Sequence, residues 1–342
     1  MQIVSPVQQK RTGNAVEVCL RCAAESMPRE RNAGLRRDDA VIFRRGIQQR
    51  ADQQAEDCFQ KNTQHGEVLS KISIPTDDRM HKIFTGLIEH LHSFAREVQL
   101  TEQEWEQGIE FLTQVGKHCS PERQEFILLS DVLGLSSLVI AQNNRKPIGC
   151  TESTVFGPFH VAEAPQLAPG EDFSQGAPGT PWFVKGKVTG LGGEIIANAT
   201  IDIWHADGDG QYDVQALGIH GLRCRGVLKA DSQGDFFFRT VVPEAYEIPR
   251  DGPVGSLLAA QGRGAWRPAH LHFMINAEGY QRLITHIFNK DDDHLNSDSV
   301  FGVRTSLIAD WVKHEPGIAP DGTICPQPFC TLDFNFVLNP VS

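Results

Sequence analysis

Two tyrosines and two histidines form the pattern in this sequence best suited to hold a metal ion. The chain has three tyrosines, and Tyr212 and Tyr246 precede the segment 267–273, which carries His270 and His272. In a strand, side chains two residues apart point to the same face, so both imidazoles can reach one ion. Two imidazoles and two phenolates form a hard, electron-rich donor set. This set favours a trivalent ion such as ferric iron over structural zinc.

Two other functions would use these residues differently. A zinc hydrolase could bind its ion through His270 and His272, but it would also need a carboxylate or third histidine, an open position and a general base. The two tyrosines would then have no role. A metal-free binding module on the same scaffold would be expected to lack at least one of the four ligands, and all four are present. Metal analysis would distinguish a ferric site, a zinc site and a metal-free scaffold.

The overall composition is ordinary for a soluble globular protein. The chain has 342 residues, 40% of them hydrophobic and 22% charged, with a net charge of −11. The negative charge argues against nucleic acid or an anionic membrane as the main partner, and no run of roughly 18 apolar residues predicts a membrane span. Residues 1–13 lack the apolar core of a secretion signal, so we expect reduced cysteines and a cytoplasmic location.

The hydrophobic pattern divides the chain into three parts. Residues 1–70 are locally basic and have no lasting period, so we expect an extension without regular structure. A mitochondrial transit peptide is the alternative because arginine is plentiful, but five acidic residues among the first 50 count against it. Residues 71–175 are expected to form a helical dimerisation and linker domain. One helix is predicted from the apolar positions between Met80 and Val98, and a second follows a capping box at Thr101 and Glu104. A third is predicted from Ser120 to about Asn143.

From about Trp182 the apolar residues alternate with period two, in short segments separated by Gly, Pro and Asp turns. Strands are predicted at 182–188, 201–203, 222–228, 236–242, 270–275, 283–288 and within 329–338. This pattern favours a β-sandwich or barrel over a βαβ fold. The predicted fold is therefore mainly β: a β-sandwich catalytic domain at 176–342, preceded by a helical layer.

These segments resemble the intradiol ring-cleavage dioxygenases, which are non-haem ferric enzymes that open catechol-type rings between the two hydroxyls. The resemblance rests on ATIDIWHA at 199–206, GQY at 210–212, VPEAY at 242–246 and RPAHLHF at 267–273. It runs from about residue 76 to the C-terminus. The four ligand types follow the family's order, and the spacing from Tyr246 to His270 is the family's.

Within that family, TESTVFGPFHV at 151–161 is most similar to the hydroxyquinol 1,2-dioxygenase branch. Catechol enzymes more often have a leucine-type residue before the Gly-Pro pair and a tyrosine after it, where this chain has Phe156 and Phe159. They also carry glutamine at the position of His286. The resemblance therefore implies cleavage of hydroxyquinol with O₂ to a ring-opened dicarboxylate, maleylacetate, with catechol or substituted catechols as the alternative.

The resemblance also implies roles for individual residues. Tyr212, Tyr246, His270 and His272 would bind one Fe(III) per subunit, and Tyr246 would also accept a substrate proton. Arg267 would stabilise negative charge on the substrate, and His286 would act as a catalytic hydrogen-bond donor. The expected pocket wall comprises Leu128, Val155, Phe156, Gly157, Pro158, Ile248 and Pro249.

Asp131 stands out because it is a lone carboxylate on an otherwise apolar helical stretch. A buried carboxylate is costly without a partner. We expect it to line the pocket and to accept a hydrogen bond from the third hydroxyl of hydroxyquinol. By resemblance, the chain is further expected to form a homodimer through its N-terminal helices, with a phospholipid as a possible ligand of that interface.

Overall fold

The computed structural model describes residues 65–72, 77–120, 123–215 and 221–341. The chain divides into two compact units, Met1–Trp105 and Glu106–Ser342. Of the predicted extension, residues 65–70 are helical and residues 1–64 lie outside the described part. The predicted domain bounds therefore remain predictions.

The first two predicted helices are confirmed. Helix α3 (Asp78–Glu97) begins after Asp77, whose carboxylate accepts the backbone N–H groups of Arg79 and Met80. Helix α4 (Glu102–Lys117) begins with the predicted capping box. The Thr101 N–H donates to the Glu104 carboxylate over 2.9 Å, and the Glu104 N–H donates to the Thr101 hydroxyl over 3.2 Å. Two N–H groups that lack helical partners are thereby satisfied.

The prediction of one long third helix was wrong, because two short helices replace it. Helix α5 (Glu125–Val132) and helix α6 (Leu135–Asn143) are separated at Gly134, which has a left-handed φ of 74°. Such a glycine terminates a helix at little steric cost. No single helix in the described ranges is long and apolar enough to cross a bilayer. Helices α5 and α6 together have enough length and apolar content, but the chain bends by 78° between them.

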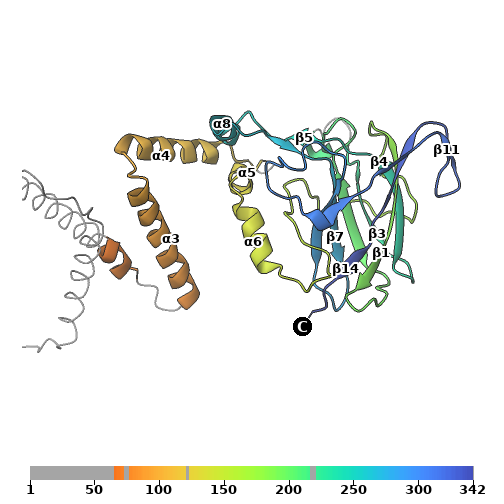
Figure 1. Cartoon of the computed structure of the whole chain (residues 1–342), viewed down its shortest axis with the longest axis horizontal. Coiled ribbons are helices and arrows are strands. Elements are labelled where there is room, and N and C mark those ends of the chain that lie inside the picture. Colours follow the sequence, from red (N-terminus) through yellow and green to blue (C-terminus); the bar gives the residue numbers. More distant parts are fainter. Residues whose placement is uncertain (1–64, 73–76, 121–122, 216–220, 342) are drawn as a thin grey trace, which may run out of the picture. The chain divides into compact units, whose positions relative to one another are not determined.

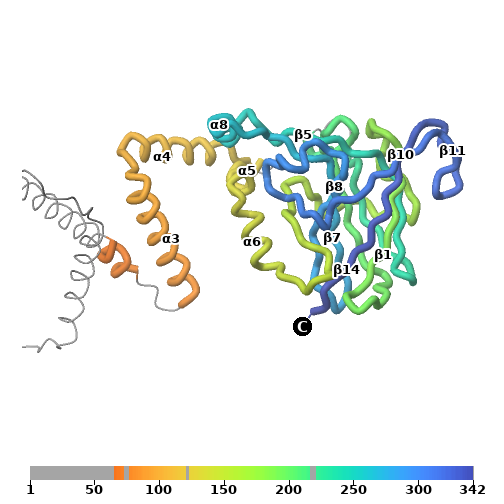
Figure 2. Tube along the Cα trace, viewed as in Figure 1, coloured from red at the N-terminus to blue at the C-terminus, as the bar shows by residue number. Residues whose placement is uncertain are grey.

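Two five-stranded sheets form the scaffold of the second unit, in agreement with the predicted β-sandwich (Figure 1). The first contains β10 (Val312–His314), β13 (Phe329–Asp333), β1 (Pro181–Gly190) and β14 (Phe336–Leu338), with β4 (Asp235–Val241) paired to β1. The second contains β3 (Arg225–Lys229), β2 (Thr200–His205), β7 (His270–Asn276), β8 (Leu283–Asn289) and β9 (Ile308–Ala309). Figure 2 shows the C-terminal strand β14 beside β1, with which it pairs in parallel.

Two short ribbons and several small elements complete this unit. Strand β5 (Tyr246–Glu247) pairs with β6 (Trp266–Arg267), and β11 (Gly317–Ile318) pairs with β12 (Ile324–Cys325). Single 3₁₀ turns lie at η1 (Asp213–Gln215) and η2 (Thr305–Leu307). The five described cysteines are unpaired thiols.

A phenylalanine-rich core fills the space between the two sheets. The ring centroid of Phe273 on β7 lies 6.4 Å from that of Phe238 on β4 and 4.6 Å from that of Phe336 on β14. Leu271 and Ile275 belong to the same cluster and are fully buried. Because side chains alternate along a strand, the intervening residues of β7, His270 and His272, face away from this core.

Helix α8 (Pro253–Ala260) was not predicted from the sequence. Its first residue is a proline, which suits the first turn of a helix because its missing N–H has no partner to lose. Pro253 was therefore a possible signal for the start of a helix, but the apolar run after it is too short to predict a helix by itself. Val254 and Leu258 of α8 join the apolar cluster that contains Tyr212 and Tyr246.

Candidate metal centre

The second sheet places the two histidines beside other ring-bearing residues. Strand β7 lies between β2 and β8, and His272 is opposite Trp204 on one side and His286 on the other. The indole of Trp204 stacks on His272, with ring centroids 4.6 Å apart and planes 18° apart. Neighbouring positions on three strands thus share the face that carries the metal-ligand candidates.

The tyrosines reach this face from two separate segments of the chain. Tyr212 follows β2 at the end of a tight turn, in which the Asp207 carboxylate accepts the N–H groups of Asp209 and Gln211. Tyr246 is the first residue of β5 and lies opposite Arg267 of β6.

Three of the four candidate ligand atoms lie within 3.3 Å of one another. The Tyr212 hydroxyl is 3.0 Å from Nε2 of His272 and 3.3 Å from Nε2 of His270, and the two Nε2 atoms are 3.1 Å apart. The ring centroid of Tyr246 lies 5.4 Å from that of Tyr212 and 5.7 Å from that of His270. The structure therefore brings together all four residues that the sequence singled out.

The hydrogen bond of His270 fixes its tautomer. Its Nδ1 is 2.7 Å from the carbonyl of Pro268, which can only accept, so Nδ1 carries the proton and Nε2 offers a lone pair. Burial, followed by the charge of Arg267, holds the pKa of His270 well below its ordinary value, so the imidazole is neutral at neutral pH. A neutral imidazole with a free Nε2 lone pair is the form that binds metals.

His286 holds the second imidazole rather than joining the ligand set. Its Nε2 is 2.8 Å from Nδ1 of His272, and its own Nδ1 is 3.0 Å from the hydroxyl of Thr154. Within the described ranges, His270, His272 and His286 also form the one group of three His, Cys, Asp or Glu side chains whose potential ligand atoms all lie within 4.8 Å of one another. However, His286 approaches the side of His272 that faces away from Tyr212 and His270, so a three-histidine zinc site is disfavoured.

This donor set fits a first-row transition-metal ion. Donors about 2.1 Å from one ion and set 90–105° apart are themselves about 3.0–3.3 Å apart, which matches the three separations above. Burial and the neighbouring Tyr246 raise the pKa of Tyr212 well above its ordinary value, although Arg267 opposes them. A bound cation is therefore needed to hold Tyr212 as a phenolate at neutral pH.

Close packing limits how His272 can move. Gly157 has a φ of 76°, and a Cβ there would lie 3.1 Å from Cε1 of His272. Glycine is required at this point both for the left-handed backbone and for the approach to the ring. The predicted pocket residue Gly157 thus also packs against one of the metal-ligand candidates.

A buried ion pair that the sequence reasoning missed anchors Tyr212. Asp213 accepts a two-point hydrogen bond from Arg225, and both side chains are essentially inaccessible to solvent. Arg225 also donates to the carbonyl of Phe159 over 3.0 Å, and the Phe159 ring stacks on Tyr212 with centroids 4.3 Å apart. The sequence feature that could have indicated this ion pair is that Asp213 directly follows Tyr212.

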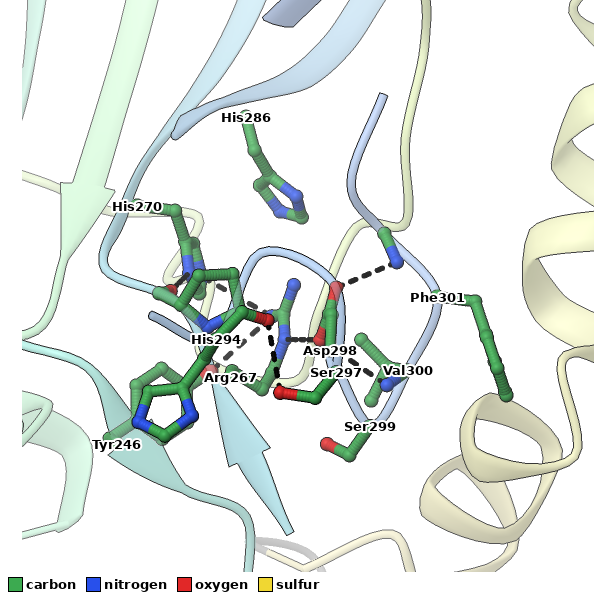
Figure 3. Close-up of polar contacts among 12 residues, drawn as sticks. Tyr246, Arg267, His270, His286, His294, Ser297, Asp298, Ser299, Val300 and Phe301 are labelled. Atoms are coloured by element: carbon green, nitrogen blue, oxygen red, sulfur yellow. Dashed lines mark hydrogen bonds and ion pairs between the residues drawn. The ribbon is translucent and has the colours of Figure 1, made fainter. Parts of the chain in front are cut away.

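Arg267 lies between the candidate ligands and a buried carboxylate, Asp298. Its Nη1 is 3.3 Å from the Tyr246 hydroxyl and 3.2 Å from Nε2 of His270, while its Nε is 3.2 Å from the Asp298 carboxylate (Figure 3). Burial lowers the pKa of this guanidinium, but Asp298 and the two tyrosines outweigh burial and raise it overall. A permanent positive charge is therefore held beside the candidate metal centre.

A cavity of about 170 Å³ opens beside Tyr246 and Arg267. Its wall includes every predicted pocket residue except Phe156. The predicted residues that line it are Leu128, Asp131, Val155, Gly157, Pro158, Ile248 and Pro249. Phe156 lies outside the lining, since its side chain is 38% exposed and its ring packs against His160 and Trp204. The sequence reasoning missed Arg123, Gln124, Glu125, Ile127, Phe159, Gln215 and Val300.

Asp131 is the buried carboxylate of this cavity. It is 6% exposed and lies in the lining of the cavity. Burial raises the pKa of Asp131, and the nearby Asp298 raises it further, while Ser136 and the positive charge of Arg267 oppose them without cancelling the rise.

Comparisons with known proteins agree with this geometry. Residues 155–340 match the family described as "Dioxygenase", and residues 77–151 match "Catechol dioxygenase N terminus". A 6-chlorohydroxyquinol 1,2-dioxygenase from Cupriavidus pinatubonensis is 56% identical over 273 residues, which cover 80% of this chain and 95% of the relative.

Solved structures give the same assignment. The hydroxyquinol 1,2-dioxygenase from Pseudomonas putida DLL-E4 superposes with a TM-score of 0.77 at 41% identity, over 82% of this chain and 99% of that one. The catechol 1,2-dioxygenase from Pseudomonas arvilla C-1 gives a TM-score of 0.71 at 27% identity, over 82% and 91%. With its two tyrosines and two histidines converging in a β-sandwich, the chain belongs to the intradiol ring-cleavage dioxygenase family.

Proposed function

We propose that this protein is an Fe(III)-dependent dioxygenase that cleaves hydroxyquinol, benzene-1,2,4-triol, with O₂ to maleylacetate. The observation that carries the proposal is the meeting of Tyr212, His270 and His272 beside a cavity that contains a buried carboxylate, Asp131. Tyr246 completes the donor set. Phenolate oxygen and neutral imidazole together suit a hard trivalent ion better than zinc, and we infer one ion per subunit.

A ferric ion in this site would draw electron density from a bound diol and so make the ring reactive towards O₂. The protein side chains then have separate tasks. Tyr246, whose hydroxyl borders the cavity, accepts a proton from a substrate hydroxyl. Arg267 stabilises the negative charge that the substrate gains, through a guanidinium that is already fixed before the reaction. His286 keeps His272 in the orientation that points Nε2 into the site.

Hydroxyquinol is favoured over catechol because of Asp131. A buried acceptor that is left unfilled by the substrate disfavours the analogue that lacks the matching hydroxyl. Catechol has no third hydroxyl to offer, whereas hydroxyquinol does. The names of similar proteins support the same choice, since they include dioxygenases for hydroxyquinol and for its 6-chloro derivative. Cleavage of catechol or substituted catechols remains the second candidate.

We also infer that the chain forms a homodimer through its N-terminal helices, with a phospholipid as a possible ligand there. The supporting observation is the apolar stripe of α3, in which Leu91 and Phe94 are each 55% exposed. A cytoplasmic location is also part of the proposal, and the unpaired thiols of the five described cysteines agree with it.

The test is a visible absorption spectrum of the purified, iron-assayed protein before and after anaerobic addition of hydroxyquinol. We expect a red-brown tyrosinate-to-iron band that shifts with the triol. Tyr212→Phe should abolish or strongly alter the band, whereas Tyr280→Phe should retain it, because the Tyr280 hydroxyl instead donates to Glu194. A colourless protein replete with iron would refute the ligand assignment. A band that responds to catechol and ignores hydroxyquinol would transfer the assignment to catechol.

A further inference from the structure

Asp298 lies directly behind the guanidinium of Arg267. The two side chains are 2% and 4% exposed, and Nε of Arg267 is 3.2 Å from Oδ1 of Asp298. In Figure 3, Arg267 lies between Asp298 on one side and Tyr246 and His270 on the other. In this orientation of the guanidinium, Nε faces Asp298 while Nη1 faces Tyr246 and His270.

The loop that carries Asp298 is built to keep this carboxylate in place. Oδ2 of Asp298 accepts the N–H of Gly302 over 2.8 Å, and Oδ1 accepts the N–H of Val300 over 3.3 Å. A Cβ on Gly302 would lie 3.1 Å from both Nη2 of Arg267 and Oδ2 of Asp298. The loop backbone therefore packs closely against the ion pair, and a Cβ at Gly302 would require these atoms to shift.

Contacts from outside the loop fix its backbone. Phe301 has a left-handed φ of 57°, which is uncommon for a residue with a bulky side chain. The Ser137 hydroxyl contacts the carbonyls of Val300 and Phe301 at 3.1 and 3.2 Å. Arg263 donates to the carbonyl of Ser299 over 3.0 Å and lies over the Phe301 ring. An unfavourable backbone conformation persists only when the surroundings determine it in this way.

We propose that Asp298 is a positioning residue, which holds the Arg267 guanidinium against Tyr246 and His270 so that its charge acts on the reacting substrate. This inference deepens the proposed function and rests on it. Asp298 makes no hydrogen bond to a candidate ligand atom itself, so the proposed effect is exerted through Arg267.

Asp298→Asn is the informative variant. The amide oxygen can still accept the Gly302 N–H, which keeps the shorter of the two loop contacts. The amide NH₂ would then face the N–H of Val300 and the Arg267 Nε–H, and it cannot accept from either. Losing a hydrogen bond between charged groups predicts a fall in kcat for hydroxyquinol of about 10- to 100-fold. The matched control is Asp321→Asn, which removes the carboxylate that pairs with Arg239 at 3.6 Å, outside the cavity lining. It should leave kcat unchanged.

A double-mutant cycle separates positioning from a merely structural role. In an Arg267→Gln background, adding Asp298→Asn should cause no further loss of kcat, because the residue through which Asp298 acts is already gone. Single-turnover measurements extend the range if Arg267→Gln is slow. Losses that multiply, or an unchanged kcat in Asp298→Asn, would overturn the proposal.

A readout that does not depend on activity is the reaction of Arg267 with phenylglyoxal, followed by peptide mass mapping of the purified protein. Arg267 should be protected in the native sequence and modified faster in Asp298→Asn, with thermal melting as the check on folding. Equal modification rates in two folded proteins would overturn the proposal. If the native protein fails to turn over hydroxyquinol but shows the protection difference, the proposed function fails while the positioning role stands.

Discussion

Replacing Asp131 by alanine should reduce the turnover of hydroxyquinol far more than the turnover of catechol. Asp131 is buried in the cavity wall, and Ser136 and Arg267 are the groups that favour its charged form. A hydrogen bond to a charged group contributes about 1.5–3 kcal/mol, which corresponds to roughly a 10- to 150-fold loss in kcat/KM for the triol. Catechol has no hydroxyl at that point, so its loss should arise only from indirect effects.

The ratio of the two kcat/KM values isolates the predicted contact. Asp131 also interacts with Arg267, but that electrostatic effect acts on both substrates and cancels in the ratio. Initial rates of O₂ consumption on both substrates supply the data. Asp131→Asn serves as the matched variant, because its amide retains an acceptor oxygen and should lose less discrimination than Asp131→Ala. A ratio that stays at its native value in Asp131→Ala would refute the contact.

Three further predictions follow from other parts of the molecule. His286→Ala should weaken metal affinity by about 10- to 100-fold, because the partner that orients His272 is lost. Competition with a chelator measures this affinity. The control is His314→Ala, because the native His314 imidazole instead hydrogen-bonds to Thr331. Burial lowers the pKa of His205 from 6.5 to about 4. As the pH falls from 6.5 to about 4, the His205 imidazole takes up a proton in the unfolded chain but stays neutral in the folded protein. The free energy of unfolding should therefore fall by about 3 kcal/mol over this range because of this residue. Urea titrations of the native protein should show this extra loss relative to His205→Gln. Leu91→Glu should shift the oligomer towards monomer in light-scattering measurements because it places a charge in the exposed apolar stripe of α3, and an unchanged mass would contradict the dimer.

Local rules in the sequence were sufficient for several elements. Reciprocal hydrogen bonds between Thr101 and Glu104 need only four consecutive residues, so the start of α4 could be read directly. The alternation of side chains in β7 likewise required His270 and His272 to share a face. The start of α5 could not be read in this way, because the buried carboxylate of Glu125 is satisfied by Arg123 and by the N–H of Val254, a residue distant in the sequence.

Strand periodicity and ligand chemistry act over a few residues, so the types of the donor residues, the strand that carries both histidines and the β-sandwich could be predicted from the sequence. The support of His272 by His286, the position of Phe156 outside the cavity and the position of Asp298 behind Arg267 emerge from the three-dimensional packing. Each of these facts depends on strand register or on a loop returning to the site. Asp298 lies 31 positions from Arg267, and no local pattern marks a partner at that separation. The contact exists because the packed sheet and its loops bring the two charges together where water cannot screen them.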